Sequence, residues 1–273
     1  KQGQFPPRWA PTFWGGYGYP VFNFNYPLAN ILAVPFLALG LHVETTLKLL
    51  FLFGVGLGVF GTYAYCRIFM PKTASLLAAC TYVLSPFLFT NIYLRGAIGE
   101  VFGYALLPIT LWMIERTRQR PSRKNKLFLF ISILSLSLAH NIVAMFVIPP
   151  LLIYIVLRVR TWHVILPSLF GLSASSFFWI PALLEKKFVT LDLVSVSNQY
   201  YLHFPTLQQL LFSVFEHGFS YPSPVDTMSF QIGGMILIAL FFGVLHVFFR
   251  TKHMKHIFGL VLGIFILSFI MLP

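Results

Sequence analysis

Residues 127–157 read LFLFISILSLSLAHNIVAMFVIPPLLIYIVL and contain no Lys, Arg, Asp or Glu. The run lies between two basic segments, RTRQRPSRKNK at 116–126 and RVR at 158–160. Because such segments stay on the cytoplasmic side of a membrane, the run must cross the membrane twice or not at all. A break at His140 and Asn141 divides it, and each half would reach only about 20–24 Å as a helix. The pattern predicts a hairpin of two short helices over 127–157, with its tip facing protein or water below the outer surface.

The composition of the chain is that of a membrane protein. Of its 273 residues, 58% are hydrophobic and only 10% are charged, whereas about a quarter of a soluble domain is charged. The other apolar runs are separated by short polar loops, which predicts an all-α polytopic membrane protein rather than a β-barrel of alternating segments. These runs are 26–41, 47–66, 73–90, 101–115, 164–184, 231–249 and 257–273.

The charges predict which side of the membrane each loop occupies. The net charge is +12, and we attribute it to cytoplasmic loops, with no nucleic-acid partner. If four basic loops are cytoplasmic, 13 of the 19 Lys and Arg lie on that side, and six of the seven carboxylates lie on the other. We therefore expect a multi-pass protein of the cytoplasmic (plasma) membrane. Residues 1–46, 91–100 and 185–230 would be extracytoplasmic.

A second decisive stretch, at 6–28, reads PPRWAPTFWGGYGYPVFNFNYPL. It has too many prolines for a membrane helix and too many aromatic side chains for a solvated linker. The apolar run that follows, 26–41, is either a span or a helix lying along the membrane surface. Pro27 and Pro35 favour the surface helix, since a span needs about 20 apolar residues.

This reading divides the chain into four parts. They are an external aromatic loop with an interfacial helix (1–46), a transmembrane core (47–184), an external loop (185–230) and two further transmembrane helices (231–273). The chain begins at Lys1 without a signal peptide, and its last apolar run stops at Pro273. We therefore expect a fragment of a longer chain, cut at both ends.

The order of these parts carries a resemblance to a known family. The aromatic loop leads into Tyr-Pro-Leu (26–28) and a Gly-rich helix, followed by CRIFMPK (66–72), ASLLAACTYVLSPF (74–87) and YLRGAIGE (93–100). This order resembles the amino-terminal half of the GT-C superfamily of polyprenyl-phosphate-sugar-dependent glycosyltransferases. PPRW, YGYPVFNFNYPL, RGAIGE and LAHN are more closely similar to uncharacterised prokaryotic multi-pass membrane proteins labelled "6-pyruvoyl-tetrahydropterin synthase-related". Nothing in the chain resembles the soluble pterin enzyme.

The resemblance implies a GT-C-like bundle and transfer of a sugar from a polyprenyl-phosphate carrier to an extracytoplasmic acceptor, with inversion. Membrane lipids and the lipid-linked sugar would be its partners. In GT-C enzymes the catalytic acid usually follows the first transmembrane helix, a region that would precede Lys1, so the resemblance names no base here. The alternative is a non-catalytic scaffold, lipid-binding or flippase component of envelope assembly. A transporter is the weaker third hypothesis, because no charged side chain lies in the middle of the long apolar runs.

The strongest candidate pair is Arg95 and Glu100, which flank Gly-Ala-Ile-Gly at an external turn. Arg95 would hold a lipid-linked phosphate and Glu100 would orient a sugar or a metal; the alternative is an ion pair or a helix cap. Arg8 would bind the same phosphate, with Trp9 as a sugar platform or as an interfacial anchor.

The remaining candidates are polar or aromatic residues expected near the same surface. His140 and Asn141 would form a site wall or a hydrogen-bonded helix break, and Glu216 and Asp226 are further carboxylates in a loop that is otherwise interpreted as solvated. Tyr17, Tyr19, Asn23 and Asn25 complete the predicted sugar and acceptor cleft. No metal site is predicted from the spacing of ligands, and a divalent metal is left open as a cofactor.

Overall fold

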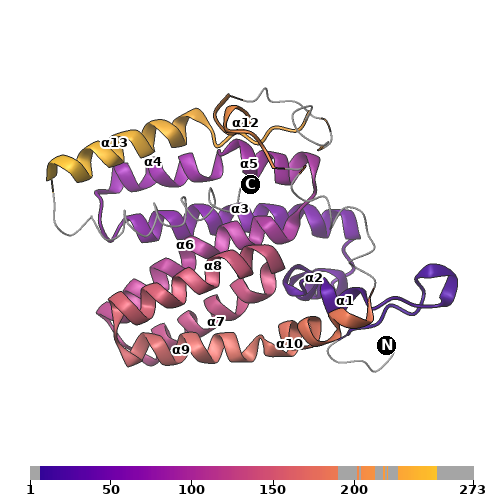
Figure 1. Ribbon diagram of the computed structural model, residues 1–273. Coiled ribbons are helices and arrows are strands. Elements are labelled where there is room, and N and C mark those ends of the chain that lie inside the picture. Colours follow the sequence, from indigo (N-terminus) through magenta and orange to yellow (C-terminus); the bar gives the residue numbers. More distant parts are fainter. Residues whose placement is uncertain are drawn as a thin grey trace. The chain divides into compact units, whose positions relative to one another are not determined.

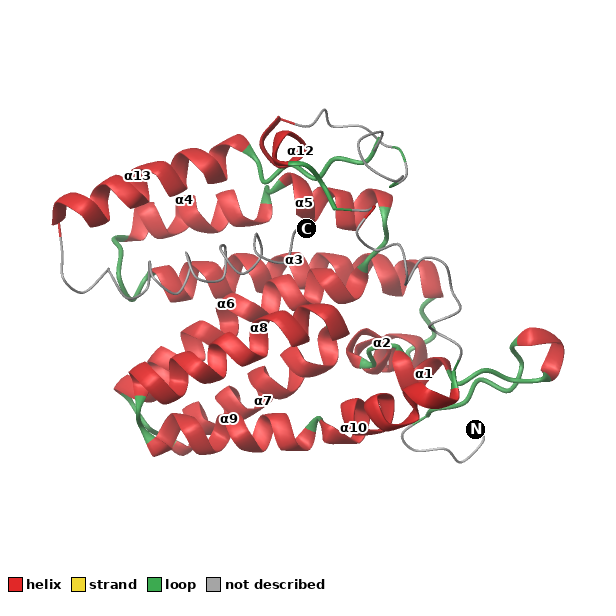
Figure 2. Ribbon diagram, viewed as in Figure 1, coloured by secondary structure: helices red, strands yellow, loops and turns green. Residues whose placement is uncertain are grey.

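The computed structural model describes residues 7–189, 202, 204–212, 218, 220 and 227–250. Their regular elements are all helices (Figures 1 and 2). Among the described residues, three helical stretches are long and apolar enough to cross a membrane. They are α3 (Val43–Cys66), α6 (Ile98–Gln119) and α8 (Asn141–Tyr154) continued by the π-helical turn η3 (Ile155–Val159). The predicted all-α membrane class is confirmed in this general form.

Two further candidate spans are bent helix pairs. In one, α4 (Lys72–Val83) is followed at 45° by α5 (Pro86–Phe89) and the π-turn η2 (Thr90–Leu94). Ser85 precedes Pro86 and is extended, with φ −64° and ψ 137°, because a proline disfavours helical geometry in the residue before it. In the other, α9 (Trp162–Ala174) meets α10 (Ser176–Glu185) and η4 (Lys186–Phe188) at 52°.

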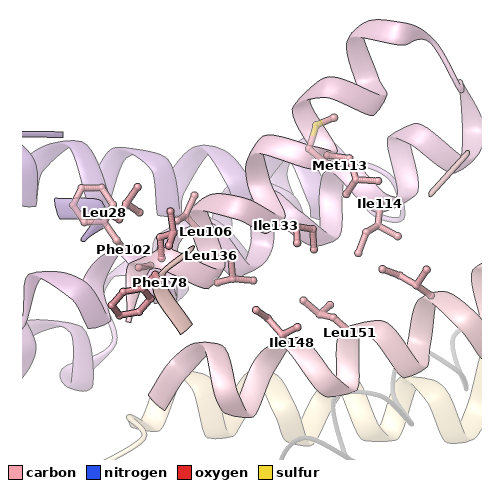
Figure 3. Packing of buried hydrophobic residues seen from close by; sticks show 14 of the residues in the cluster. Leu28, Phe102, Leu106, Met113, Ile114, Ile133, Leu136, Ile148, Leu151 and Phe178 are labelled. Carbon is pink, nitrogen blue, oxygen red and sulfur yellow. The ribbon is translucent and has the colours of Figure 1, made fainter. Parts of the chain in front are cut away.

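The chain divides into two compact units. The first comprises Lys1–Phe69 and Ile98–Val189, and the second comprises Met70–Ala97 and Thr190–Pro273. In the first unit α6 packs on α3 and on α7 (Arg123–Ala139), and α7 packs in turn on α9. Figure 3 shows the core between them, formed by fully buried apolar side chains that include Phe102, Ile114, Ile133, Leu136 and Leu151.

Glycines set the close approach of α3 to α6. A Cβ on Gly61 would lie 2.5 Å from Ile109 Cγ1, and one on Gly54 would lie 3.0 Å from Val101 Cγ1. Gly56, by contrast, faces open space. Glycines spaced seven apart lie on one helix face, so this face of α3 lets the two backbones meet.

The run 127–157 folds as two helices that meet at His140. Ser122 caps the start of α7, where its Oγ accepts a hydrogen bond from the Asn125 backbone N–H at 3.2 Å. His140 is extended (φ −161°, ψ 130°), and its Nδ1 accepts from the Val143 N–H at the start of α8. The side chain that breaks the run therefore also caps the second helix.

The N-terminal segment of the first unit contains only short helices. They are the 3₁₀ turn η1 (Trp14–Gly16), α1 (Val21–Phe24) and α2 (Leu28–Ala38). With 11 residues, α2 is about 16 Å long, roughly half of the hydrocarbon core. It therefore cannot span a membrane on its own, as expected for 26–41. Its orientation along the surface stays a prediction.

The second unit is described in part. Here α13 (Gly234–Arg250) packs against α4, and the short α12 (Leu207–Phe212) is tied to residue 232 by a hydrogen bond from the Ile232 N–H to the Leu210 carbonyl at 2.9 Å. Gly233, with φ +102°, lies against Pro86, where a Cβ would approach the proline Cδ to 2.7 Å. The predicted apolar run 257–273 lies outside the described residues.

Candidate functional site

Polar side chains from four separate elements meet at one end of the first unit. They come from the N-terminal segment, the first turn of α6, the α7–α8 junction and the end of α10. We call this group the end cluster. Its members are Arg8, Asn23, Tyr26, Glu100, His140, Asn141 and Glu185.

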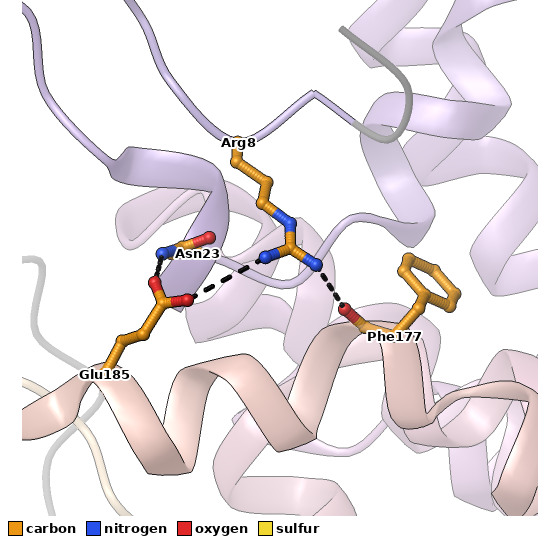
Figure 4. A network of polar contacts seen from close by, with 4 residues as sticks. All are labelled: Arg8, Asn23, Phe177 and Glu185. Atoms are coloured by element: carbon orange, nitrogen blue, oxygen red, sulfur yellow. Dashed lines mark hydrogen bonds and ion pairs between the residues drawn. The ribbon is translucent and has the colours of Figure 1, made fainter.

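The first part of the end cluster surrounds Glu185, at the last turn of α10 (Figure 4). Arg8 Nη1 lies 3.8 Å from Glu185 Oε1, and Arg8 Nη2 donates a hydrogen bond to the Phe177 carbonyl at 3.4 Å. The side chains of Arg8 and Glu185 are 42% and 41% exposed. An ion pair this exposed stabilises a fold by less than about 1 kcal/mol, so its contribution to stability is small.

Asn23 joins the same group from a more buried position. Its Nδ2 donates a hydrogen bond to Glu185 Oε2. Its Oδ1 is buried and accepts no hydrogen bond from the described residues. A buried polar atom without a hydrogen-bond partner costs about 1–3 kcal/mol. The described surroundings of Asn23 therefore leave part of the hydrogen-bonding capacity of its amide unused.

The second part of the end cluster is built on His140 and Glu100. His140 Nε2 lies 3.9 Å from Glu100 Oε1, and the two side chains are only 12% and 14% exposed. Because His140 Nδ1 accepts a backbone hydrogen bond, the neutral imidazole carries its proton on Nε2, which faces the carboxylate.

The ring of Tyr26 packs on the imidazole and fixes its place. The two ring centroids are 4.6 Å apart, with an interplanar angle of 46°. On its other side Tyr26 lies against Gly99, where a Cβ would approach the ring to 2.2 Å. Gly99 therefore creates the space that Tyr26 fills, directly before Glu100 in α6.

Asn141 connects the two parts of the end cluster. Its Nδ2 donates a hydrogen bond to the Phe24 carbonyl at 2.7 Å. This bond ties the tip of the hairpin to the segment between Asn23 and Tyr26. Asn25 lies in that segment at the end of α1, and its N–H donates to the Val21 carbonyl at 2.8 Å.

The aromatic segment forms a closed loop beside the end cluster. Ala10 and Tyr19 exchange two backbone hydrogen bonds, of 2.8 and 3.0 Å, as an isolated antiparallel bridge. Trp9 packs over Gly18, which has φ +82° and lies so close that a Cβ would be 2.3 Å from the indole Nε1. At the far end of the loop Tyr17 is 90% exposed. Figure 1 shows this indigo segment extending away from α1.

Other predicted residues lie elsewhere. Arg95 belongs to the second unit, where its Nη1 donates to Asn91 Oδ1 at 2.7 Å. The predicted pair of Arg95 and Glu100 is thus described in two separate units, each residue with its own partner. Glu216 and Asp226 lie outside the described residues.

Sequence reasoning missed two members of the end cluster, Tyr26 and Glu185. Glu185 is the first charged residue after the apolar run 164–184, and a carboxylate at such a border is a usable signal. The sequence singles out Tyr26 only within the Tyr-Pro-Leu motif. Within the described residues, no three His, Cys, Asp or Glu side chains gather as a metal site would require.

Comparisons of the chain with models of known protein families, with curated proteins and with solved structures found no match.

Proposed function

We propose that the chain is a membrane glycosyltransferase-like protein of GT-C type. It would transfer a sugar from a polyprenyl-phosphate carrier to an extracytoplasmic acceptor. The observation that carries this proposal is the end cluster, in which an arginine, two carboxylates and a histidine from four elements meet at one end of a helical unit. A sugar phosphate on a lipid needs these groups at the end of a membrane bundle: a cation for the phosphate and polar groups for the sugar.

Arg8 is the group best suited to the phosphate of the carrier. A guanidinium binds phosphate through two parallel N–H donors, and Arg8 is partly exposed, with contacts of 3.8 and 3.4 Å to Glu185 and the Phe177 carbonyl. In the second unit, Arg95 stays a further candidate.

The aromatic loop supports binding of the sugar. Trp9, Tyr17 and Tyr19 are exposed, and flat aromatic faces pack against the C–H faces of sugar rings while their polar atoms remain hydrated. The amides of Asn23 and Asn25 add donors and acceptors for hydroxyl groups. This loop would close over the donor or the acceptor.

Glu100 is the candidate base among the described residues. In the proposed step a carboxylate takes the proton of the acceptor hydroxyl, whose oxygen attacks the anomeric carbon. The bond from that carbon to the phosphate oxygen breaks, and polyprenyl phosphate leaves with the bonding electrons. His140, held by its backbone hydrogen bond, would keep its Nε2 beside the Glu100 carboxylate before the step. Glu216 and Asp226 stay alternatives for the base, and a divalent metal stays open as a cofactor.

One observation favours the second hypothesis, a non-catalytic scaffold or lipid-binding component. Arg8, Asn23 and Asn141 each contact a protein group in the end cluster. A structural clamp that closes the N-terminal segment over the helix ends would use the same contacts. The two hypotheses differ in whether removing the charge of Glu100 changes turnover or only stability.

The test is release of polyprenyl phosphate by the purified full-length protein from carriers that bear a labelled sugar. We expect Glu100→Gln to lower turnover by about 10²-fold or more, the usual contribution of a general base. Glu44→Gln is the matched control, because Glu44 is an exposed carboxylate that pairs with Lys48 in the first turn of α3. Absence of turnover with every carrier, or equal turnover of both variants, would favour the scaffold.

The proposal also requires that the aromatic loop and the basic loops lie on opposite sides of the membrane. We expect an impermeant thiol reagent to label Tyr17→Cys from outside intact cells and Arg120→Cys only after the membrane is opened. Cys66 and Cys80 are first replaced in both variants. Labelling of both positions from the same side would remove the compartment that the proposed cleft needs.

A further inference from the structure

A cavity of about 760 Å³ lies between α7 and α9, in the first unit. Its lining comes from the first turns of α7, with Lys126 and Phe130, and from the length of α9, from Trp162 and His163 to Ala174. We call this cavity the α7–α9 groove. We propose that it binds one molecule of an anionic phospholipid, with the headgroup at Lys126 and an acyl chain along the apolar part.

The length of the α7–α9 groove fits one leaflet of a bilayer. From His163 to Ala174 the helix advances 11 residues, or about 16 Å, and the hydrocarbon core is about 30 Å thick. A groove with one end at the headgroups therefore reaches close to the midplane. Trp162 lies at the headgroup end, and tryptophan is enriched at that depth.

The walls suit a hydrocarbon chain. Phe130, Leu166 and Phe170 line the groove, and Leu166 and Phe170 are exposed large apolar residues of α9. Below them the two helices are in close contact, since a Cβ on Gly171 would lie 2.7 Å from the Phe130 carbonyl oxygen. The floor of the groove is thus continuous packed protein, and its open side is apolar.

Positive charge near the start of α7 favours an anionic headgroup at that end of the α7–α9 groove. Lys126 is the last of six positive residues in 116–126, and Arg160 lies two residues before Trp162. The sequence from 101 to 184 holds one carboxylate, Glu115, which is already paired with Arg118 at 2.8 Å. The headgroup end is therefore strongly cationic. Anionic lipids concentrate in the cytoplasmic leaflet, the side on which these basic loops are expected.

The α7–α9 groove is separate from the end cluster. Its headgroup end lies at the start of α7, near Arg123, whereas α7 ends at Ala139, next to His140 of the end cluster. The phospholipid is therefore not the sugar donor of the proposed reaction. This inference stands whether or not the chain transfers sugars.

The test is lipid binding by the detergent-purified full chain, measured by native mass spectrometry. Phosphatidylglycerol is compared with phosphatidylcholine of the same acyl chains, and we expect tighter binding of phosphatidylglycerol. Lys126→Gln should lower its affinity about fivefold, the effect of one cationic side chain at an anionic surface. Lys124→Gln removes the same charge two residues away, where Lys124 contacts the Phe128 ring rather than the groove, and should lower the affinity clearly less than Lys126→Gln does.

A second variant tests the acyl part. Ala174→Trp places a large ring at the exposed far end of the groove, and we expect weaker binding of long-chain phosphatidylglycerol with no loss for a short-chain form. Glycerol 3-phosphate should not compete, because it lacks the chain. Equal binding of the two lipids, equal effects of the two lysine variants, or competition by glycerol 3-phosphate would overturn the proposal. A different occupant of the groove, a second copy of the chain, would be indicated if the protein formed a dimer that Ala174→Trp dissociated while lipid binding did not change. That result would also overturn the proposal.

Discussion

Replacing Gly61 by alanine tests the packing that positions α6. The new Cβ would lie 2.5 Å from Ile109 Cγ1 and 2.9 Å from Ile109 N. The side-chain atom can move, but the backbone nitrogen can move only if α3 and α6 separate. Overpacking of this kind costs about 1–3 kcal/mol. Alanine also gains about 1 kcal/mol in helix propensity over glycine, so the net change at Gly61 is between about zero and 2 kcal/mol of destabilisation.

Gly56→Ala isolates the packing effect, because the same helix and the same chemical change are used. No atom lies within 4 Å of a Cβ at Gly56, so only the propensity gain of about 1 kcal/mol remains. We therefore expect Gly56→Ala to be more stable than Gly61→Ala by about 1–3 kcal/mol. The assay is unfolding in mixed micelles, followed by circular dichroism. Equal stability of the two variants would refute the close approach of α3 to α6.

Three further predictions concern polar and aromatic contacts. Gly99→Ala should destabilise the protein by about 1–3 kcal/mol, since its Cβ would approach the Tyr26 ring to 2.2 Å, and adding Tyr26→Ala should restore part of the loss in the same unfolding assay. A double-mutant cycle of Arg8→Gln and Glu185→Gln should give a coupling below about 1 kcal/mol, because both side chains are about two-fifths exposed; a coupling several times larger would contradict this. Glu115→Gln should lower the free energy of unfolding by about 1–3 kcal/mol, as that carboxylate is 4% exposed and accepts two short hydrogen bonds, and an unchanged unfolding midpoint would count against it.

The sequence predicted where helices lie better than where they begin or bend. Apolar runs predicted starts at 47 and 127, whereas α3 begins at Val43 and α7 at Arg123. Hydropathy detects the part of a helix that lies in lipid, and the polar first turns are helical without being apolar. No proline or glycine adjoins Ser175, so the sequence does not predict the bend there. There the serine Oγ donates to the Leu172 carbonyl at 2.7 Å, a side-chain bond that competes with the helix.

The sequence names five members of the end cluster as separate candidates (Arg8, Asn23, Glu100, His140 and Asn141), but it does not predict their partners. Arg8, Glu100 and His140 are candidates because each is a charged or polar residue beside an apolar run. That argument uses only the sequence neighbours of each residue. Their partners depend on which helix ends meet, as with Asn23 and Glu185, which lie 162 positions apart. No spacing rule in a single sequence predicts a contact of that separation, since it depends on how α10 returns to the N-terminal segment.

The two carboxylates of α6, Glu100 and Glu115, have different contacts, and the proposed function assigns them different roles. Glu115 accepts hydrogen bonds of 2.8 Å from Arg118, within α6, and of 2.9 Å from Tyr154, which joins α6 to α8. Glu100 and His140 are 3.9 Å apart, beyond the reach of a hydrogen bond between them. Glu100 faces an imidazole that its backbone hydrogen bond holds in place, and in the proposed function this carboxylate would meet the acceptor hydroxyl. Glu115→Gln should therefore reduce stability more than any activity per folded molecule, and Glu100→Gln should do the reverse. A Glu100→Gln variant that unfolds as readily as Glu115→Gln would identify the end cluster as a clamp.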